Sequence, residues 1–488
     1  MVQYTDPDTL GRAPHHPVVC TGFAVRTDSD GILFVKTVGS QGMGSKIVLH
    51  TFGSLGDLNP YLGIALGLKS MGHAPMIATT GVYREYVEGA GIGFHPVRPD
   101  LSIGDRETIR RVMDPKGGLE FLLRGVLLSQ LRESYLDLEE SLRGASLLIT
   151  HPLSFAGHVA AEKLRIPWVS TVLAPISFLS AWDPPILPEF SFLQNLQVLG
   201  PAVNRWIYTR LPKLYTRKWV DPVRRLRKEL GLPAGRNPLF DGQHSPGLVL
   251  ALFSRVIANP QKDWPDRTVV TGFVIYDRDL HGEGIGEKLD RFLEAAPPPI
   301  VFTLGSSAVF EAGNFYRESA KAASALGKRA VLLLGKDLAQ DIPYPLPEGV
   351  AAFPYAPYSE IFPRCAALVH SGGIGTIAQA MRAGRPSLAV YYGFDQPDNA
   401  ARLARLGMGK AVSAKKYTAD LAASLLREII ENPVYADRAS SMGNRVRAED
   451  GAGTACLAIE RFLRGTLGDT AAMVPSAPLD DKRDLGTH

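Results

Sequence analysis

The chain has 488 residues, more than one ordinary domain needs, and this length predicts two sizeable domains. Its composition, 45% hydrophobic and 21% charged, is that of a globular protein, and a net charge of +4 is too small to indicate nucleic acid binding. Three scattered cysteines, no leader pattern and no run of about 18 apolar residues predict a cytoplasmic protein without a disulfide framework or a membrane span.

Residues 1–42 differ from the rest of the chain. They mix Pro, Gly, Asp and Ser and show no helical periodicity, so we expect a flexible N-terminal extension. Met43 stands just before the first apolar strand, which leaves open whether the extension belongs to the native protein or precedes its true start.

Residues 43–275 alternate short apolar strands with amphipathic helices, a pattern typical of a parallel sheet with helices on both faces. The first helix is expected from about Leu58 to Gly72, because its apolar residues share one helical face. The predicted strands are Ile47–His50, Met76–Thr79, Leu147–Thr150 and Trp168–Val172.

A second alternation occupies residues 290–445, after a polar linker over residues 276–289. Residues 446–466 are expected to form a C-terminal helix that packs back on the N-terminal domain, and residues 467–488 a disordered tail. We therefore predict an α/β fold of two doubly wound Rossmann-like domains that face each other across a cleft. The strands expected in the second domain are Ile300–Leu304, Ala330–Leu334, Val350–Phe353, Ala367–His370 and Ser387–Val390.

A glycine-rich turn follows the strand Ala367–His370 and leads into a helix expected over Thr376–Ala383. It reads His-Ser-Gly-Gly-Ile-Gly-Thr over residues 370–376. Glycines allow a close backbone approach, and the free amides and dipole of a helix N-terminus favour an anion such as a diphosphate. The alternative is a tight turn that binds no ligand.

An acid–amide pair, Asp395-Gln396, follows the next strand, Ser387–Val390. A carboxylate accepts hydrogen bonds and an amide both donates and accepts them, so the pair suits two sugar hydroxyls. The alternative is that the aspartate only caps the following helix.

Together these segments resemble the family 1 nucleotide-sugar glycosyltransferases of GT-B fold, from about Lys46 to Arg464, and within them the bacterial branch similar to sterol glucosyltransferases and rhamnosyltransferases. The resemblance implies that Tyr355 stacks on the nucleobase, that the glycine-rich turn binds the diphosphate and that the acid–amide pair binds the sugar. The implied donor site comprises Gly56, Ser306, Ser307, Tyr355, His370, Ser371, Gly372, Gly373, Gly375, Thr376, Gln379, Asp395 and Gln396.

Two residues depart from the family pattern. Ser371 stands where a phosphate-contacting histidine is usual, and Gln379 stands where a ribose-binding glutamate is usual. Because the amide of Gln379 lacks the charge that holds two ribose hydroxyls, a deoxyribose donor such as a dTDP-sugar becomes an option.

The turn after the first strand is expected to carry the base that deprotonates the acceptor hydroxyl. In the resemblance, the position after the second glycine of Gly53-Ser54-Leu55-Gly56 holds this base, which makes Asp57 the candidate. A free carboxylate is a weak base near neutral pH, so its surroundings must activate it, or it acts mainly by positioning. The alternative is a simple helix cap, and His151, after the strand Leu147–Thr150, is the second candidate base.

Aromatic residues between Pro175 and Trp219 are expected to line an apolar or aromatic acceptor, with Phe178 and Trp182 as the named candidates. A basic run follows, from Arg217 to Lys228, and two interpretations stay open: peripheral contact with an anionic membrane, or a solvated helix face.

The sequence thus predicts an inverting, metal-independent transferase that moves a hexose from UDP-glucose or dTDP-rhamnose to a hydroxyl of an apolar or aromatic small molecule. No cofactor is expected, and Asp277-Arg278-Asp279, which matches an Asp-x-Asp metal motif, is interpreted as a solvated part of the linker. Two alternatives remain: a glycolipid-forming rhamnosyltransferase at a membrane surface, and a non-catalytic relative that binds nucleotide and partners an enzyme. The oligomeric state is left undetermined.

Overall fold

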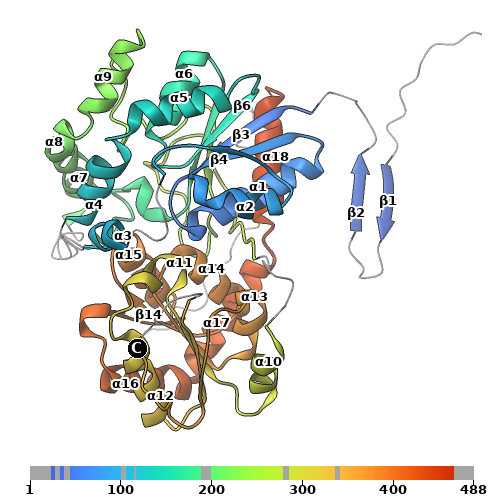
Figure 1. Cartoon of the computed structure of the whole chain (residues 1–488), viewed down its shortest axis with the longest axis vertical. Coiled ribbons are helices and arrows are strands. Elements are labelled where there is room, and N and C mark those ends of the chain that lie inside the picture. Colours follow the sequence, from blue (N-terminus) through green and yellow to red (C-terminus); the bar gives the residue numbers. More distant parts are fainter. Residues whose placement is uncertain are drawn as a thin grey trace, which may run out of the picture. The chain divides into compact units, whose positions relative to one another are not determined.

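The computed structural model describes residues 23–27, 33–37, 44–100, 106–114, 117–187, 199–277, 285–335 and 341–465. The chain forms two compact units, Met1–Gly44 and Ser45–His488 (Figure 1). The predicted C-terminal tail and half of the predicted linker, residues 278–284, lie outside the described residues.

The first unit contains a β-hairpin, although no regular structure was predicted for residues 1–42. Strand β1 (Phe23–Thr27) pairs antiparallel with β2 (Leu33–Thr37), with Val25 opposite Val35. Both strands contain β-branched and aromatic residues, which favour strand pairing, and the flexibility of the N-terminal extension stays a prediction.

The second unit begins with a seven-stranded parallel sheet, in the order β5-β4-β3-β6-β7-β8-β9. The chain order reverses between β3 and β6, and ligands bind at such a point beyond the carboxyl ends of the strands. The strands are β3 (Lys46–His50), β4 (Ala74–Thr79), β5 (Gly93–Pro96), β6 (Leu147–Thr150), β7 (Trp168–Val172), β8 (Val249–Ala251) and β9 (Thr268–Val270).

A second parallel sheet of six strands follows, in the order β12-β11-β10-β13-β14-β15. Its order reverses between β10 and β13, whose following turns carry the Gly305-Ser306 and glycine-rich segments. Two doubly wound parallel sheets confirm the predicted fold class. The strands are β10 (Ile300–Thr303), β11 (Ala330–Leu333), β12 (Val350–Phe353), β13 (Ala367–His370), β14 (Ser387–Tyr391) and β15 (Gly409–Ser413).

Helices connect the strands of both sheets (Figure 1). Those associated with the first sheet are α1 (Leu55–Ser70), η1 (Gly81–Tyr83), α2 (Arg84–Gly89), α3 (Arg106–Val112), α4 (Gly118–Glu120), η2 (Phe121–Leu127), α5 (Leu131–Ser141), α6 (Phe155–Leu164), η3 (Pro175–Phe178), α7 (Pro201–Arg205), η5 (Trp206–Arg210), α8 (Leu211–Tyr215), η6 (Thr216–Lys218) and α9 (Asp221–Glu229). Those that follow are α10 (Glu287–Glu294), α11 (Gly305–Ala308), η7 (Val309–Glu311), α12 (Phe315–Ala325), α13 (Tyr358–Ile361), η8 (Phe362–Arg364), α14 (Ile374–Ala383), α15 (Gln396–Arg405), η9 (Ala414–Lys416), α16 (Ala419–Glu431), α17 (Pro433–Arg447) and α18 (Gly451–Leu463).

Apolar residues of β3 pack on both faces of the first sheet, because successive side chains of a strand point to opposite faces. Ile47 and Leu49 join one buried cluster and Val48 joins another. The last helix, α18, belongs to the first of these clusters: its Cys456 donates to the backbone oxygen of Ile64 in α1 at 3.5 Å. The C-terminal end of the described chain therefore packs against the helix that begins the N-terminal sheet.

Candidate active site

The turn after β3 holds Asp57 in a fixed position. Helix α1 begins at Leu55, three residues before the predicted start, with Ser54 as its N-cap. The backbone amide of Ser54 donates to Oδ2 of Asp57 at 2.8 Å, so the two residues form a capping box. Gly53 has φ of 130°, and a Cβ there would lie 2.3 Å from the same carboxylate oxygen, so the turn needs glycine at this position.

The other oxygen of Asp57 faces His151, at the end of β6. Nε2 of His151 lies 3.3 Å from Oδ1 of Asp57, and the backbone amide of Leu153 donates to Nδ1 at 3.1 Å. Because Nδ1 accepts that bond, the hydrogen-bond network assigns the ring hydrogen of a neutral imidazole to Nε2, which donates to the carboxylate. The Asp57 side chain is 34% exposed and that of His151 only 6%, so Asp57 is the group that a ligand reaches.

A second buried pair lies behind this one, and the sequence interpretation missed it. Nδ1 of His50, at the end of β3, bonds with the hydroxyl of Ser154, the N-cap of α6. Burial, and secondarily the neighbouring His151, lowers the pKa of His50 to about 3. His50 is the last residue of β3 and Ser154 directly precedes α6, and these positions at the edge of the sheet are the sequence feature that could have indicated the pair. A narrow cavity of about 20 Å³ opens beside them; apolar side chains along it include Phe52, Val97, Leu127, Leu131, Leu153 and Phe155.

The glycine-rich turn after β13 is built largely from its own polar groups. Nδ1 of His370 accepts from the amide of Gly372 at 3.0 Å, and burial lowers the pKa of His370 to about 4. The hydroxyl of Ser371 donates to the backbone oxygen of Leu304 at 2.7 Å. These side chains are buried, so their hydrogen bonds hold the turn in place. In this conformation the hydroxyl hydrogen of Ser371 is engaged by the turn itself, and the place of Ser371 in the donor site stays a prediction.

Helix α14 begins at Ile374, two residues earlier than predicted, and its N-cap is Gly373, which has no capping side chain. The first amides of an α-helix have no partner within the helix, so they are suited to bind an anion. A Cβ added to Gly375 would meet no atom within 4 Å, so space lies open beside this first turn. A Cβ on Gly305 would meet the Thr376 hydroxyl at 3.2 Å, so the two predicted donor turns lie against each other.

The remaining predicted donor residues lie on neighbouring elements. Tyr355, between β12 and α13, is 44% exposed, as a platform for a flat ring requires. Ser306 lies in α11, and Gln379 is nearly buried on α14, one turn after Thr376. Ser307 also lies in α11.

Gly56 is a different case from the other predicted donor residues. Its amide donates to the Ser54 hydroxyl at 3.2 Å as part of the α1 cap. The amide is therefore engaged within the turn that holds Asp57, and a donor contact of Gly56 stays a prediction.

Asp395 stands at the N-cap of α15, and its Oδ2 accepts from the side-chain amide of Asn399 at 2.7 Å. Burial raises the pKa of Asp395 to about 6, and the negative charge of Asp57 adds to this rise, while the bond from Asn399 opposes it. The two carboxylates, one from each sheet, thus lie within electrostatic range of each other. Helix α1 also contacts α11 and α14, so the candidate base and the donor turns come together.

Gln396 is oriented toward its own loop. Its Oε1 accepts from the amides of Tyr392 at 2.8 Å and Gly393 at 3.4 Å, and the side chain is buried. The carbonyl oxygen that was predicted to meet a sugar hydroxyl therefore closes the loop after β14, and only its NH2 group is left for a ligand.

The two aromatic residues predicted to line the acceptor are not brought together. Phe178 stacks on Trp264, with ring centroids 4.1 Å apart, within a buried cluster. Trp182 is 45% exposed, and Nζ of Lys262 lies 4.8 Å from the centroid of its ring. Phe178 is partly buried and lies among aromatic rings from later parts of the chain, so its role in lining an acceptor stays a prediction.

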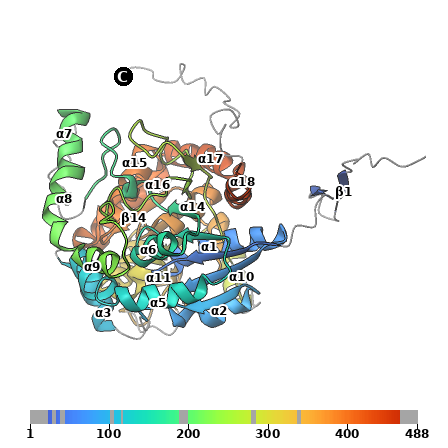
Figure 2. The same cartoon turned by 90° about the horizontal axis from the view of Figure 1, so that it is seen from above.

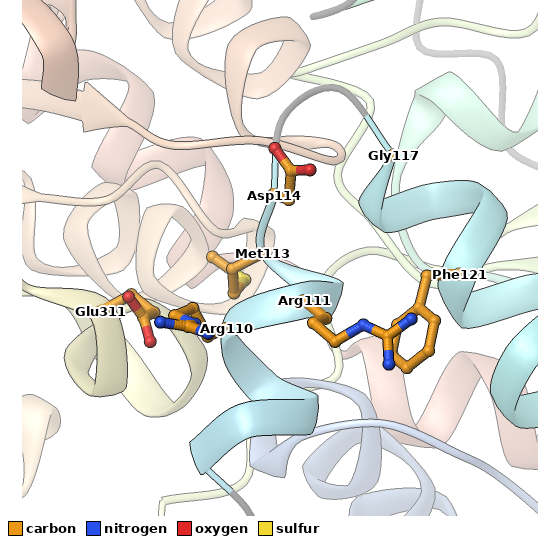
Figure 3. Close-up of a pocket in the computed structure, with 7 residues that line it drawn as sticks. All are labelled: Arg110, Arg111, Met113, Asp114, Gly117, Phe121 and Glu311. Carbon is orange, nitrogen blue, oxygen red and sulfur yellow. The ribbon is translucent and has the colours of Figure 1, made fainter.

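A larger cavity, of about 600 Å³, lies between α3 and η7 (Figure 3). Arg110, Arg111 and Met113 line it from the side of the first sheet, and Glu311 lines it from the side of the second. The guanidinium of Arg111 stacks on Phe121, 3.8 Å from the ring centroid. Since η7 directly follows α11, this cavity opens next to the donor turn; its remaining lining residues are Asp114, Gly117 and Phe121.

Within the described residues, no group of three or more His, Cys, Asp or Glu side chains is arranged to hold a metal ion. Of the Asp-x-Asp segment only Asp277 is described, and its carboxylate accepts from the amide of Ser359 at 2.7 Å. None of the helices in the described part of the chain is long and apolar enough to cross a membrane.

Comparisons with known proteins agree with this geometry. Residues 321–453 match the family described as Erythromycin biosynthesis protein CIII-like, C-terminal domain. The chain is 30% identical over 433 residues to the O-mycaminosyltylonolide 6-deoxyallosyltransferase of Streptomyces fradiae, a match that covers 86% of this chain and 97% of that protein. It is 28% identical over 434 residues to the sterol 3-beta-glucosyltransferase of Yarrowia lipolytica, a match that covers 85% of this chain but only 28% of the longer relative.

Solved structures share the fold at lower sequence identity. The glycotransferase of kitacinnamycin has a TM-score of 0.65 at 19% identity, with 86% of this chain and 99% of that chain covered. VinC, solved in complex with DTDP, has a TM-score of 0.57 at 20% identity, with 86% of this chain and 100% of that chain covered. The two parallel sheets, the glycine turn at the start of α14 and a relative that is 30% identical over nearly its whole length show that this chain belongs to the family 1 nucleotide-sugar glycosyltransferases of GT-B fold.

Proposed function

We propose that this glycosyltransferase moves a hexose, with inversion and without a metal ion, to a hydroxyl of an apolar or aromatic small molecule, and that Asp57 is its base. One arrangement carries the proposal: Asp57 is held on one side by the Ser54 amide and on the other by His151, and its helix α1 contacts α11 and α14 of the donor side. A base fixed on one sheet and a sugar-binding carboxylate fixed on the other suit attack on a sugar held between them.

In the proposed reaction the diphosphate lies at the N-terminus of α14 and against the Gly305 turn. The Asp395 carboxylate accepts a hydrogen bond from a sugar hydroxyl, and Asp57 accepts the proton of the acceptor hydroxyl as its oxygen attacks the anomeric carbon. The bond between that carbon and the diphosphate breaks, and the electron pair leaves with the diphosphate. The unpaired amides of α14 stabilise the charge that develops there.

His151 has a supporting role in this scheme. Its Nε2–H donates to Asp57, and its Nδ1 is engaged by the Leu153 amide, so the neutral ring has no lone pair facing the acceptor. We therefore propose that His151, the second candidate base, orients Asp57, the first.

For the donor we propose a thymidine diphosphate 6-deoxyhexose, such as dTDP-rhamnose, ahead of UDP-glucose. The relative from Streptomyces fradiae is by name a 6-deoxyallosyltransferase, and VinC was solved with DTDP. Gln379 stands where a glutamate is usual. Its neutral amide cannot act as a charged acceptor for the hydrogen bonds of two ribose hydroxyls, and a deoxyribose has only one of them. The sterol glucosyltransferases support UDP-glucose as the alternative, with a sterol-like acceptor.

The proposed acceptor route passes the cavity between α3 and η7, which has the size of a small-molecule site. Met113 and the ring of Phe121 supply apolar contact there, and Arg110 and Arg111 supply charge at its edge (Figure 3).

The test is a donor screen with the purified full chain, in which dTDP-rhamnose and UDP-glucose are each offered with phenolic, sterol and hydroxy-fatty-acid acceptors. We expect mass spectrometry to detect a glycosylated product that wild-type protein forms and Asp57→Asn protein forms far more slowly. If nucleotide binds but neither donor is consumed with any acceptor, the non-catalytic alternative replaces this proposal.

A further inference from the structure

Exposed apolar side chains gather on one helical segment of the protein. The segment runs from Leu199 through α7, η5 and α8 to Lys218, and we name it the rim helix. Large apolar side chains usually lie in the interior, so such a concentration on a surface marks an interaction site. Six of its large apolar side chains are between 37% and 68% exposed: Leu199, Val203, Trp206, Leu211, Leu214 and Tyr215.

The exposed residues follow the helical repeat. Leu199, Val203 and Trp206 are three or four residues apart, close to one helical turn, and Leu211, Leu214 and Tyr215 follow after the π-helical turn of η5; we call these six side chains the apolar stripe. The opposite face is buried through Ile207 and other residues, so the packing of the helix on the protein leaves the stripe unexplained. Figure 1 and Figure 2 both place α7 and α8 at the margin of the second unit.

The charge of the rim helix has one sign. Residues 199–218 contain five Lys or Arg residues and neither Asp nor Glu. Lys213 pairs with Asp241 at 2.6 Å, whereas no ion pair engages Arg205, Arg210, Arg217 or Lys218 within the described parts of the chain.

The basic run from Arg217 to Lys228 divides into two parts in the structure. Arg227 is buried and pairs with Glu162 at 2.8 Å, and Arg224 pairs with Asp221 at 2.8 Å. Arg225 and Lys228 are exposed and have no ion pair among the described residues, so they continue the free positive charge of Arg217 and Lys218 into α9.

Trp182 extends this surface toward the active site. The side-chain amide of Asn204, on the buried face of α7, donates to the backbone oxygen of Ala181 at 3.1 Å. The exposed indole of Trp182 follows directly and lies under Lys262, so another aromatic residue and another cation border the rim helix.

We propose that the rim helix docks on an anionic phospholipid bilayer. Leucine and valine side chains suit the acyl boundary, tryptophan and tyrosine suit the headgroup level, and cations suit anionic headgroups. An acidic protein surface would match the charge as well. Exposed aliphatic and aromatic side chains beside cations, however, match the succession of acyl chains and anionic headgroups in a lipid interface. The surface is separate from Asp57 and the donor turns, so the inference does not depend on the proposed reaction.

The test is co-sedimentation of the full chain with phosphatidylcholine vesicles, with and without phosphatidylglycerol. We expect binding only to the anionic vesicles, and weaker binding as salt is raised. The double variant Arg210→Gln/Arg217→Gln should weaken binding about 30-fold, since each cation near an anionic surface contributes about 1 kcal/mol. Trp206→Ser/Leu214→Ser should abolish the remaining, salt-resistant part.

Matched controls lie on other exposed faces. Lys415→Gln/Lys416→Gln removes two cations from η9, and Leu136→Ser removes an exposed leucine from α5; both should bind vesicles like wild type. Circular dichroism and nucleotide binding check that every variant is folded. The inference is overturned if wild type ignores anionic vesicles at low salt, or if control and rim-helix variants lose binding equally. It is likewise overturned if the rim-helix variants only dissociate an oligomer, because a second copy then covers the surface.

Discussion

At the scale of single residues, the capping alternative and the catalytic interpretation of Asp57 are compatible. One carboxylate oxygen caps α1 through Ser54, and the other is bonded to His151 and partly open to solvent. Capping fixes the orientation of the side chain, so a helix cap is here also the means of positioning a candidate base.

Asp57→Asn is expected to lower kcat by about 100- to 10,000-fold, the usual contribution of a general base. His151→Ala should lower kcat by only about tenfold, because it removes one hydrogen bond to a charged group. Steady-state kinetics with the identified donor measure both changes. Calorimetry should find nucleotide affinity unchanged in either variant, and a larger loss in His151→Ala than in Asp57→Asn would reverse the two assigned roles.

The raised pKa of Asp395 predicts that donor binding weakens as the pH falls below about 6, which would appear as an acid limb in the pH profile. Its pKa is raised to about 6, so in the folded protein the carboxylate takes up a proton as the pH falls through 6 and then no longer accepts two hydrogen bonds. The KM for the donor should therefore rise below pH 6 while kcat changes less. Measured pH profiles check this, and Asp395→Asn should raise KM at all pH values and remove the limb; a limb that persists in that variant belongs to another group.

At the scale of elements, glycines determine where the two turns lie. Gly53, at φ of 130°, leaves room for the Asp57 carboxylate to accept from the N-cap of α1. Gly305, at φ of 71°, lets the turn after β10 approach α14. The amphipathic patterns that predict the helices carry no such information, since these contacts join segments separated in the chain.

Gly53→Ala should lower both stability and activity. A positive φ strains any L-residue by about 1 kcal/mol, and here the added Cβ also meets the Asp57 carboxylate at 2.3 Å. Gly72→Ala is the matched control: its φ is 93°, and a Cβ there meets no atom within 4 Å. By urea unfolding we expect a larger loss of stability in Gly53→Ala than in Gly72→Ala, because only the first adds a clash to the positive φ. We expect a fall in kcat only in Gly53→Ala; equal kcat values in the two variants would show that the geometry of this turn does not affect catalysis.

At the scale of the whole molecule, a buried ion cluster joins the segment after β7 to α15. Arg402, with 2% of its side chain exposed, pairs with Asp398 at 2.8 Å and with Asp183. Asp398 also accepts from the backbone amide of Ile186 at 3.0 Å. The cluster thus ties the segment that carries Trp182 to the helix that begins beside Asp395.

Arg402→Met should lower the free energy of unfolding by about 3 to 5 kcal/mol, because it leaves two carboxylates without their buried partner. Arg405→Met is the control, since Arg405 is 62% exposed and lies 3.5 Å from Asp183, so its loss should change stability by at most about 1 kcal/mol. Urea unfolding curves measure both free energies of unfolding. Equal losses in the two variants would contradict the argument that the burial of Arg402 makes its ion pairs the more stabilising ones.

Two buried histidines predict a loss of stability in mild acid. The pKa of His50 is about 3 and that of His370 about 4, both below the unfolded value of 6.5. The unfolded chain therefore binds more protons between about pH 4 and 6.5, and stability is complete above that window and falls as the pH drops through it. Asp395, whose pKa is raised, has the opposite sign between 3.8 and about 6 and offsets part of this loss.

The change should be on the order of 3 kcal/mol for His370 alone between pH 6.5 and 4, at about 1.4 kcal/mol per pH unit for one proton. Urea unfolding at several pH values measures it. His370→Asn keeps an acceptor for the Gly372 amide but does not titrate there, so its curve should be flatter by about one proton. A wild-type stability that stays level from pH 7 to 4.5 would contradict the assignment.

The sequence by itself predicted the fold class, four of the seven strands of the first sheet and five of the six strands of the second, because strand periodicity, glycine turns and family motifs are local features; β5, β8, β9 and β15 were not predicted. It also predicted Asp57, His151 and Asp395 as site residues, and their roles stay predictions. Only the tertiary structure decided that His151 bonds to Asp57, that Gln396 and Ser371 serve their own turns, and that Phe178 stacks on Trp264. Each of these outcomes depends on the direction of a side chain toward a distant segment, and that direction is fixed by packing between the elements.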